Sequence, residues 1–190
     1  MAVLDSPAPA MADMTRAPRA SRAAGGYWLR RYYMAELASY LRFLVSPGQS
    51  VLMLGCQEGA LLAALQPSRG VGLDASEACV EEARRRYPSL RCEVGEMRAC
   101  AVEETFDVIV LPHVVDFMTD VQAELEQLRR VCHARTRLVL MTHNYLWAPL
   151  LVWLERVGLK RAKGAYAWLT LNDLQNLLSL AGFEAIRREY

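Results

Sequence analysis

Val51-Leu52-Met53-Leu54-Gly55-Cys56-Gln57-Glu58-Gly59 is the stretch of sequence that decides the fold of this chain. Its first four residues are apolar and predict a buried strand, and the glycine-punctuated turn after them leads into a helical pattern. A second apolar run, 70–73, ends in Asp74, about 20 residues after the turn, which is the separation expected for a ribose-binding acid. Together these features predict half of a mononucleotide site, in which the turn holds one part of a nucleoside ligand and the carboxylate holds its sugar.

The composition of the chain is that of an ordinary globular protein. It has 190 residues, of which 53% are apolar and 23% are charged, and its net charge is +1. This length suits one domain with a core of its own, and the near-neutral charge argues against a nucleic-acid partner. Five scattered cysteines without a Cys-x-x-Cys pair favour free thiols in a reducing, cytoplasmic setting over disulfides or a metal site.

The N-terminal segment differs in composition from the rest of the chain. It is rich in Ala, Pro, Ser and Arg and has no apolar core of signal-peptide length, so we expect a disordered leader over 1–25. Residues 26–190 are then the folded domain. The chain contains no run of about 18 apolar residues, which argues against a membrane-spanning helix.

Strand and helix patterns alternate along this domain. Expected strands cover 51–54, 70–73, 90–94, 106–111, 137–142 and 183–188, and expected helices cover 27–44, 60–65, 76–87, 121–132 and 170–182. Alternation of this kind indicates βαβ units. The predicted fold class is therefore α/β, with a Rossmann-like, doubly wound, mostly parallel sheet and helices on both of its faces.

Polar residues mark the ends of these helices. Ser76 is a candidate N-cap, and Thr119 and Thr170 each precede an amide or acid by three residues, which is the spacing of a capping box. His133 follows the end of a helix, where we expect a C-terminal cap. The apolar face expected for the first helix consists of Tyr33, Leu37, Tyr40, Leu41 and Leu44.

In open α/β sheets, ligands bind beyond the carboxyl ends of the strands, where the strand order reverses. Gly55 and Gly59 permit a positive φ and a close approach of the backbone. Asp74 is suited to accept two hydrogen bonds from ribose hydroxyls, and Glu96 to accept one from a purine amino group. The alternatives are a helix-capping acid at 74 and a solvated loop acid at 96. All residues expected to bind a cofactor are Gly55, Cys56, Gln57, Gly59, Asp74, Ala75, Glu96, Met97 and Leu111.

Four motifs in this order resemble those of the class I S-adenosylmethionine-dependent methyltransferases. They lie at 51–59, at 70–76 (Gly-Val-Gly-Leu-Asp-Ala-Ser), at 106–113 (Phe-Asp-Val-Ile-Val-Leu-Pro-His) and at 128–140. The resemblance runs from Tyr27 to the C-terminus and implies S-adenosylmethionine as cofactor, with Asp74 on its ribose. A narrower resemblance, to bacterial methyltransferase domains beside family 2 glycosyltransferases, implies a downstream or partner glycosyltransferase domain.

The chain also departs from the family pattern. Met53 stands where the family usually has an acidic residue that helps to hold the methionine end of the cofactor. Gln57 replaces the middle glycine, and if that position needs a positive φ the strain is on the order of 1 kcal/mol or more. Glu96 stands where the family commonly has Asp. The family's final antiparallel strand is apparently missing, so the domain is expected to be cut short at its C-terminus.

The resemblance implies in-line transfer of a methyl group from a sulfonium, for which positioning supplies most of the rate. A base is needed only if the acceptor must lose a proton. His113 and His143 follow the expected fourth and fifth strands and are the candidate catalytic residues. The apolar stretch 145–154 is interpreted as a helix packed on the sheet; alternatively, Trp147 and Trp153 form a lid over a glycan or lipid-linked acceptor or touch a membrane surface peripherally.

Three functions remain open on these residues. The first is a methyltransferase acting on an unidentified small-molecule or glycan acceptor. The second is a catalytically inactive methyltransferase-fold interaction module, which Met53 and Gln57 favour. The third is a dinucleotide oxidoreductase, whose fingerprint wants Gly at 57 and Gly or Ala at 60, and of these only Ala60 fits.

Overall fold

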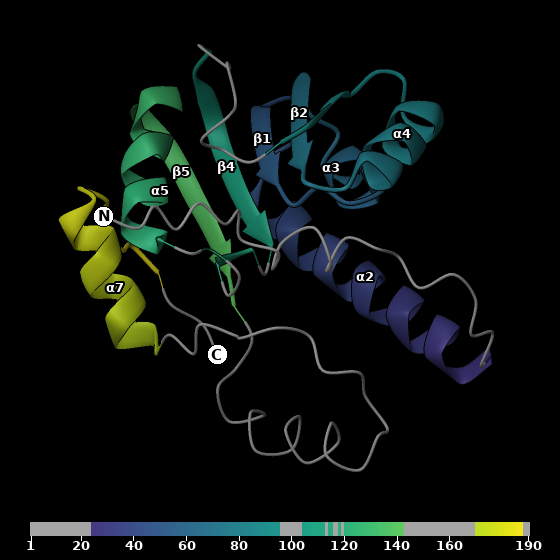
Figure 1. Cartoon of the computed structure of the whole chain (residues 1–190), viewed down its shortest axis with the longest axis horizontal. Coiled ribbons are helices and arrows are strands. Elements are labelled where there is room, and N and C mark those ends of the chain that lie inside the picture. The colour runs from purple at the N-terminus through teal and green to yellow at the C-terminus, as the bar shows by residue number, and fades with distance from the viewer. Residues whose placement is uncertain are drawn as a thin grey trace, which may run out of the picture.

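The computed structural model describes residues 24–95, 104–112, 114–115, 118, 120–142 and 170–187, with side chains from Tyr32 onward. Its centre is a parallel sheet of five strands in the order β3-β2-β1-β4-β5 (Figure 1). The strands are β1 (Ser50–Leu54), β2 (Arg69–Asp74), β3 (Arg91–Val94), β4 (Phe106–Pro112) and β5 (Cys132–Met141). The Rossmann-like, doubly wound sheet expected from the sequence is confirmed.

The strand β1 lies in the middle of this sheet. The strands β2 and β3 add to one side of it, and β4 and β5 add to the other, so the strand order reverses between β1 and β4. Because all pairs are parallel, the five carboxyl ends lie on one edge of the sheet. A crevice at such a reversal is where an open α/β sheet binds its ligand.

Helices cover both faces of the sheet, as expected. One face carries α2 (Ala24–Leu44), α3 (Ala60–Ala64) and α4 (Glu77–Arg86), and the other carries α5 (Val121–Leu128) and α7 (Leu171–Leu180) (Figure 1). The helix α2 begins just before the domain boundary expected at residue 26. None of the helices in the described part of the chain is both long enough and apolar enough to cross a membrane.

Successive residues of β1 belong to opposite cores, because side chains alternate across a sheet. Val51 and Met53 join the apolar cluster under α2, α3 and α4, whereas Leu52 and Leu54 join the cluster under α5 and α7. None of these four residues is more than 4% exposed. Burial on both faces is the reason why β1 reads as an uninterrupted apolar run in the sequence.

The caps of α4 and α7 are confirmed. Ser76 caps α4 through its hydroxyl, and Thr170 caps α7 in a capping box. The expectation for α5 is wrong: its N-cap is Asp120 rather than Thr119, because the Asp120 carboxylate accepts a hydrogen bond of 3.0 Å from the backbone N–H of Ala123. Thr119 itself lies outside the described residues.

The inward face of α2 is narrower than expected. Leu37 and Leu41 are buried, and Val45 continues their line just past the end of the helix. The two tyrosines assigned to this face lie at its border instead, with Tyr33 46% and Tyr40 38% exposed. A tyrosine at such a border packs its ring while its hydroxyl stays near water.

β5 begins at Cys132 rather than at residue 137, so the helix expected over 121–132 is too long. The helix α5 ends at Leu128, and one 3-10 turn, Arg129–Val131, leads directly into the strand. The pairing register with β4 shifts after Phe106, which marks a bulge in the first half of β5.

The sixth strand expected at 183–188 is wrong for the described residues 183–187, which belong to no strand. The backbone N–H of Phe183 instead bonds to the carbonyl of Leu178 at the end of α7, at 2.8 Å. Ile186, an apolar residue of the expected strand, is 89% exposed. A strand forms only where its backbone groups pair with a neighbouring strand, and among the described residues this segment has no such partner.

Candidate functional site

The turn after β1 lies at the carboxyl edge of the sheet, at the reversal of strand order. Gly55 and Gly59 have φ values of +73° and +77°, which confirms the positive values expected of them. Gln57, between them, has a φ of +49°, a left-handed conformation that disfavours a side chain. The turn therefore keeps the backbone path of a glycine-rich ligand loop although one glycine is replaced.

Gly55 also allows two loops to touch. A Cβ placed on Gly55 would lie 2.4 Å from Cγ2 of Val114, which follows β4. The side chain of Val114 thus packs directly on the backbone of the turn after β1. The sequence places Val114 at the ligand edge but does not predict this contact, because nothing in one sequence relates positions so far apart in the chain.

Asp74 ends β2 and faces this turn. One carboxylate oxygen accepts a hydrogen bond of 2.7 Å from the backbone N–H of Gln57, and the other accepts one of 2.9 Å from that of Ser76. The residue is only 2% exposed, and burial raises the pKa of its carboxyl although the two hydrogen bonds act to lower it. A carboxylate has about four acceptor positions, so about two remain for the hydroxyls of a sugar.

Asp74 contacts both loops at this edge of the sheet, and it does not itself cap α4. Its bond to Ser76 positions the residue that caps α4, and its bond to Gln57 ties the β2 end to the turn after β1. Because both bonds come from backbone N–H groups, the carboxylate holds the two ligand loops in a fixed relation. Its role as the ribose acid stays a prediction.

A small cavity of about 30 Å³ opens beside the turn, and it is lined by Met34, Cys56, Gln57, Glu58, Ala60 and Leu61. A cavity of this size admits a water-sized molecule. Met34 brings α2 to the site, a contribution that the sequence patterns did not reveal. Two of the predicted cofactor residues, Cys56 and Gln57, share this cavity.

The remaining sequence candidates divide into two groups. Leu111 and Met53 are fully buried in opposite cores, so their side chains do not face a ligand, and Leu111 can offer only its backbone. Ala75 is half-buried beside Asp74. The candidates Glu96, Met97, His113, His143, Trp147 and Trp153 lie outside the described residues.

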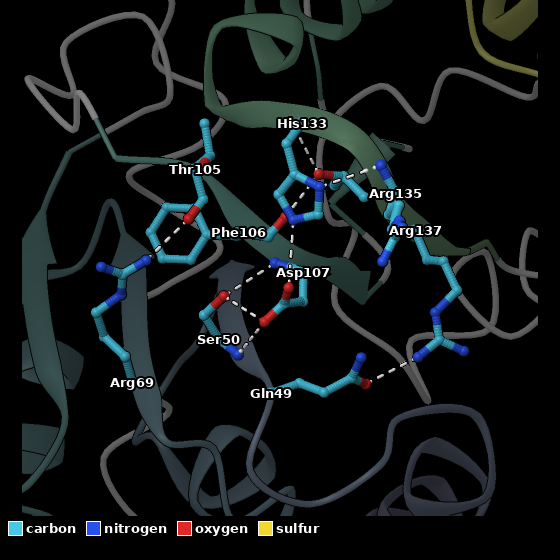
Figure 2. Close-up of polar contacts among 10 residues, drawn as sticks. Gln49, Ser50, Arg69, Thr105, Phe106, Asp107, His133, Arg135 and Arg137 are labelled. Carbon is cyan, nitrogen blue, oxygen red and sulfur yellow. Dashed lines mark hydrogen bonds and ion pairs between the residues drawn. The ribbon is translucent and has the colours of Figure 1, made fainter.

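His133 lies at the opposite, amino edge of the sheet and does not cap a helix (Figure 2). Its Nε2 is 3.2 Å from an oxygen of Asp107, and its Nδ1 accepts from the backbone N–H of Arg135 at 3.1 Å. Since Nδ1 accepts, Nε2 carries the proton and donates it to Asp107. The C-terminal cap expected for His133 is therefore wrong, because the bulge of β5 turns the ring toward β4.

The same carboxylate also binds the start of β1. The backbone N–H and the hydroxyl of Ser50 donate to the other oxygen of Asp107 at 2.8 and 2.7 Å (Figure 2). These bonds, led by the one from the Ser50 backbone, lower the pKa of Asp107. This network joins the amino ends of β1, β4 and β5, far from the ligand edge, and its role is to hold the strands together.

Comparison with known proteins identifies a family. A family model described as a methyltransferase domain matches residues 27–188. An uncharacterized 37.1 kDa protein in transposon TN4556 of Streptomyces fradiae is 35% identical over 103 residues, which are 50% of this chain and 30% of that protein. The chain thus spans less than a third of the length of that relative.

Solved structures share the fold at low identity. A chain of a Haloferax volcanii complex between the Trm112 methyltransferase activator and a methyltransferase has a TM-score of 0.66 at 21% identity, covering 83% of this chain and 71% of that one. A SAM-dependent methyltransferase of Thermotoga maritima, described as a possible histamine N-methyltransferase, has a TM-score of 0.64 at 20% identity, with coverages of 86% and 79%. CalS10, a SAM-bound amino pentose methyltransferase of Micromonospora echinaspora, has a TM-score of 0.52 at 21% identity, with coverages of 68% and 60%.

Proposed function

This chain belongs to the methyltransferase domain family, and we propose that it transfers a methyl group from S-adenosylmethionine to a small-molecule or glycan acceptor. The observation that carries the proposal is the pair of hydrogen bonds from Gln57 and Ser76 to the carboxylate of Asp74. They fix an acid with about two unused acceptor positions beside a turn of positive φ. The two hydroxyls of a ribose require such an acceptor.

The residues of the turn fit the cofactor that the family implies. Gly55, Gln57 and Gly59 would approach its methionine end with backbone groups, Asp74 would hold its ribose, and Glu96 would accept from its adenine. When bound, the cofactor supplies a methyl group on a sulfonium, which is reactive without further activation. The chain's own task is then to orient the two reactants and to exclude water.

A base becomes necessary when the acceptor is a hydroxyl or an amine that loses a proton in the transfer. His113 and His143 follow β4 and β5 in the sequence, and we propose His113 first and His143 second for that role. Substitution of either by Gln removes the proton acceptor. It should lower kcat for such an acceptor and leave cofactor affinity unchanged.

We propose a sugar-like acceptor. CalS10 acts on an amino pentose, which supports a sugar-like acceptor for a chain of the same fold. A partner or downstream glycosyltransferase domain, a cytoplasmic location and a peripheral membrane contact through Trp147 and Trp153 complete the proposal. Each of these stays an expectation from the sequence.

The second candidate function, an inactive interaction module, rests on two observations. Position 53 is a fully buried methionine, so it lacks the acidic side chain that the family usually has there. Gln57 places a side chain at a position of positive φ where the family has glycine. Both changes would weaken the hold on the methionine end of the cofactor. Cofactor binding separates this candidate from the first.

The decisive experiment measures binding of S-adenosylmethionine and S-adenosylhomocysteine by calorimetry and by the shift of the melting temperature. A ligand present at 100 times its dissociation constant stabilises a fold by about 2.7 kcal/mol. We expect such stabilisation with both ligands. The absence of any shift with millimolar ligand would contradict the methyltransferase proposal, and a shift with nicotinamide dinucleotides instead would favour the oxidoreductase.

Two variants show whether Asp74 is the ribose acid. Asp74→Asn should abolish binding of both ligands, because the amide offers one acceptor oxygen and both N–H groups of the loops already face this side chain. The control, Asp107→Asn, alters a carboxylate at the opposite edge and should leave affinity unchanged. Equal affinity in Asp74→Asn and in the unaltered chain would show that another residue holds the ribose.

A further inference from the structure

Two cysteines lie directly beneath the proposed cofactor turn. Cys56 belongs to the turn itself and is 3% exposed, and Cys92 belongs to β3 and is 2% exposed. Both are part of the apolar cluster under α2, α3 and α4. Methyl transfer requires neither thiol, so their placement calls for a separate explanation.

The glycine at position 72 brings these thiols together. Gly72 of β2 is paired with Cys92 of β3, so their side-chain positions share one face of the sheet on strands about 4.8 Å apart. Sγ and Cβ of Cys56 lie only 2.7 and 2.8 Å from where a Cβ on Gly72 would be. Cys56 thus fills the space that Gly72 leaves empty, next to Cys92, and its thiol donates to the carbonyl of Gln57 at 3.7 Å.

We propose that Cys56 and Cys92 form an oxidative modification site, at which a peroxide converts the two thiols to a disulfide and thereby weakens cofactor binding. The second half of this proposal rests on the proposed function. The covalent half is independent of that function. A disulfide needs Cβ atoms about 4 Å apart, and Cys56 packs over Gly72, the residue paired with Cys92.

The chemistry requires two steps. The thiolate of Cys92 attacks one oxygen of the peroxide, so an S–O bond forms, the O–O bond breaks, and hydroxide leaves and takes up a proton to become water. Cys56 then loses its proton, and its sulfur attacks the sulfenic sulfur of Cys92, which forms the S–S bond and releases a second water. The two sulfurs give up two electrons in total, and the peroxide is reduced to two molecules of water.

The surroundings suit Cys92 as the first thiol to react. The neighbouring thiol of Cys56, and after it the charge of Arg84, lower the pKa of Cys92 to about 7 although burial raises it, and this favours the reactive thiolate. Arg84 is held in place because its Nε donates to the carbonyl of Cys92 at 2.7 Å. The cavity of about 30 Å³ reaches Cys56, the neighbour of Cys92, from the side of the turn.

The disulfide would act on the cofactor site through one residue. Gln57 follows Cys56 directly, and its backbone N–H holds the carboxylate of Asp74. Drawing Cys56 onto β3 shifts this N–H away from Asp74 and closes the cavity beside the turn. Both changes remove groups that the proposed cofactor needs, so oxidation should raise the dissociation constant at least tenfold.

The test treats the full chain with hydrogen peroxide and maps its disulfides by mass spectrometry of peptides prepared without reductant. The expected product is one peptide pair that joins Cys56 to Cys92, which dithiothreitol releases. A pair that joins Cys56 to Cys79 instead, a pair that includes any other cysteine, or the absence of any linked peptide would overturn the proposal. This readout needs no cofactor, so it is independent of the proposed function.

Binding of S-adenosylhomocysteine is then measured before oxidation, after oxidation and after reduction. The expected affinity falls in the oxidised chain and returns in the reduced one, whereas Cys92→Ser should bind equally in all three states. The control Cys132→Ser changes a thiol that bonds to the carbonyl of Leu128 and should behave as the unaltered chain does. Failure of the reduced chain to bind would contradict the proposed function, whereas an unchanged affinity in the disulfide form would contradict the regulatory half of this inference.

Discussion

Two glutamines of this chain adopt the left-handed backbone conformation. Gln57 has a φ of +49° in the proposed cofactor turn, and Gln66 has a φ of +50° after α3. Both side chains are exposed, so neither gains packing from this conformation. For a residue with a Cβ the left-handed region costs about 1 kcal/mol or more, and the surrounding structure must offset that cost. Gln57 also touches the ligand edge, and Gln66 does not.

This pair allows backbone strain to be separated from ligand binding. Gln57→Gly and Gln66→Gly should each raise the free energy of unfolding by up to about 1 kcal/mol, because glycine relieves the strain but adds freedom to the unfolded chain. Only Gln57→Gly should also bind S-adenosylhomocysteine more tightly, since it restores the middle glycine of the turn. Urea denaturation and calorimetry measure the two effects, and an equal gain of affinity in Gln66→Gly would argue against a local role of Gln57.

For single residues, the sequence predicts the backbone conformation but not the side-chain contacts between residues that are distant in the chain. The left-handed turn could be foreseen because Gly55 and Gly59 mark it directly, and their spacing makes the strain at Gln57 visible as well. The packing of Val114 on Gly55 and of Cys56 on Gly72 could not be foreseen, because each joins residues that only the folded sheet brings together. Met53 and Leu111 lie in the cores on opposite faces of the sheet. An uninterrupted apolar run does not show which residue faces which core, because both faces of such a strand are buried.

The bulge in β5 is held by hydrogen bonds of a threonine side chain. Phe106 pairs with Cys132 and Val108 with Arg137, so a step of two residues along β4 corresponds to a step of five along β5. The hydroxyl of Thr136 donates to the carbonyl of Phe106 at 2.6 Å and accepts from the backbone N–H of His133 at 2.7 Å. It thus satisfies two backbone groups that the interrupted ladder leaves without a partner.

Thr136→Val keeps the shape of this side chain and removes both of its hydrogen bonds. We expect the free energy of unfolding to fall by about 1–3 kcal/mol, because a half-buried N–H and a carbonyl lose their partner. Amide exchange at His133 should become faster, which hydrogen exchange with mass spectrometry or NMR detects. Thr105→Val, at an exposed position just before β4, is the matched control and should change neither quantity.

Elements in the middle of the sheet are easier to predict than those at its edge. β1, β2 and β4 are apolar because helices cover both faces, and their expected bounds are nearly those observed. β5 is half-exposed, and its first half depends on the hydroxyl of Thr136 rather than on an apolar pattern, so its start at Cys132 was missed. The segment 183–187 shows the opposite error, because its apolar residues predicted a strand, whereas among the described residues it pairs with no strand.

At the scale of the whole molecule, two carboxylates at opposite edges of the sheet respond to pH in opposite directions. The bonds from Ser50 lower the pKa of Asp107 below its ordinary value of 3.8, so the folded chain holds this proton less tightly than the unfolded chain does. Burial raises the pKa of Asp74 above the same ordinary value, so the folded chain holds that proton more tightly. The Asp107 carboxylate joins the amino ends of the strands, and the Asp74 carboxylate ties the end of β2 to the turn after β1 at the proposed ligand edge.

The opposite shifts of the two carboxyl pKa values predict two different dependences of stability on pH. The stability that Asp107 contributes is present above pH 3.8 and is lost as the pH falls through its lowered pKa. The difference in unfolding free energy between the unaltered chain and Asp107→Asn should therefore shrink on the acid side.

The charge of Asp74 opposes folding, and this penalty develops as the pH rises from 3.8 through its raised pKa. The unaltered chain should therefore lose stability relative to Asp74→Asn as the pH rises over that window. Urea denaturation of the three proteins from about pH 3 to pH 7 measures both differences. Because the lost hydrogen bonds of each variant add an offset that does not depend on pH, only the slopes are compared, and slopes of the same sign would contradict the opposite directions of the two pKa shifts.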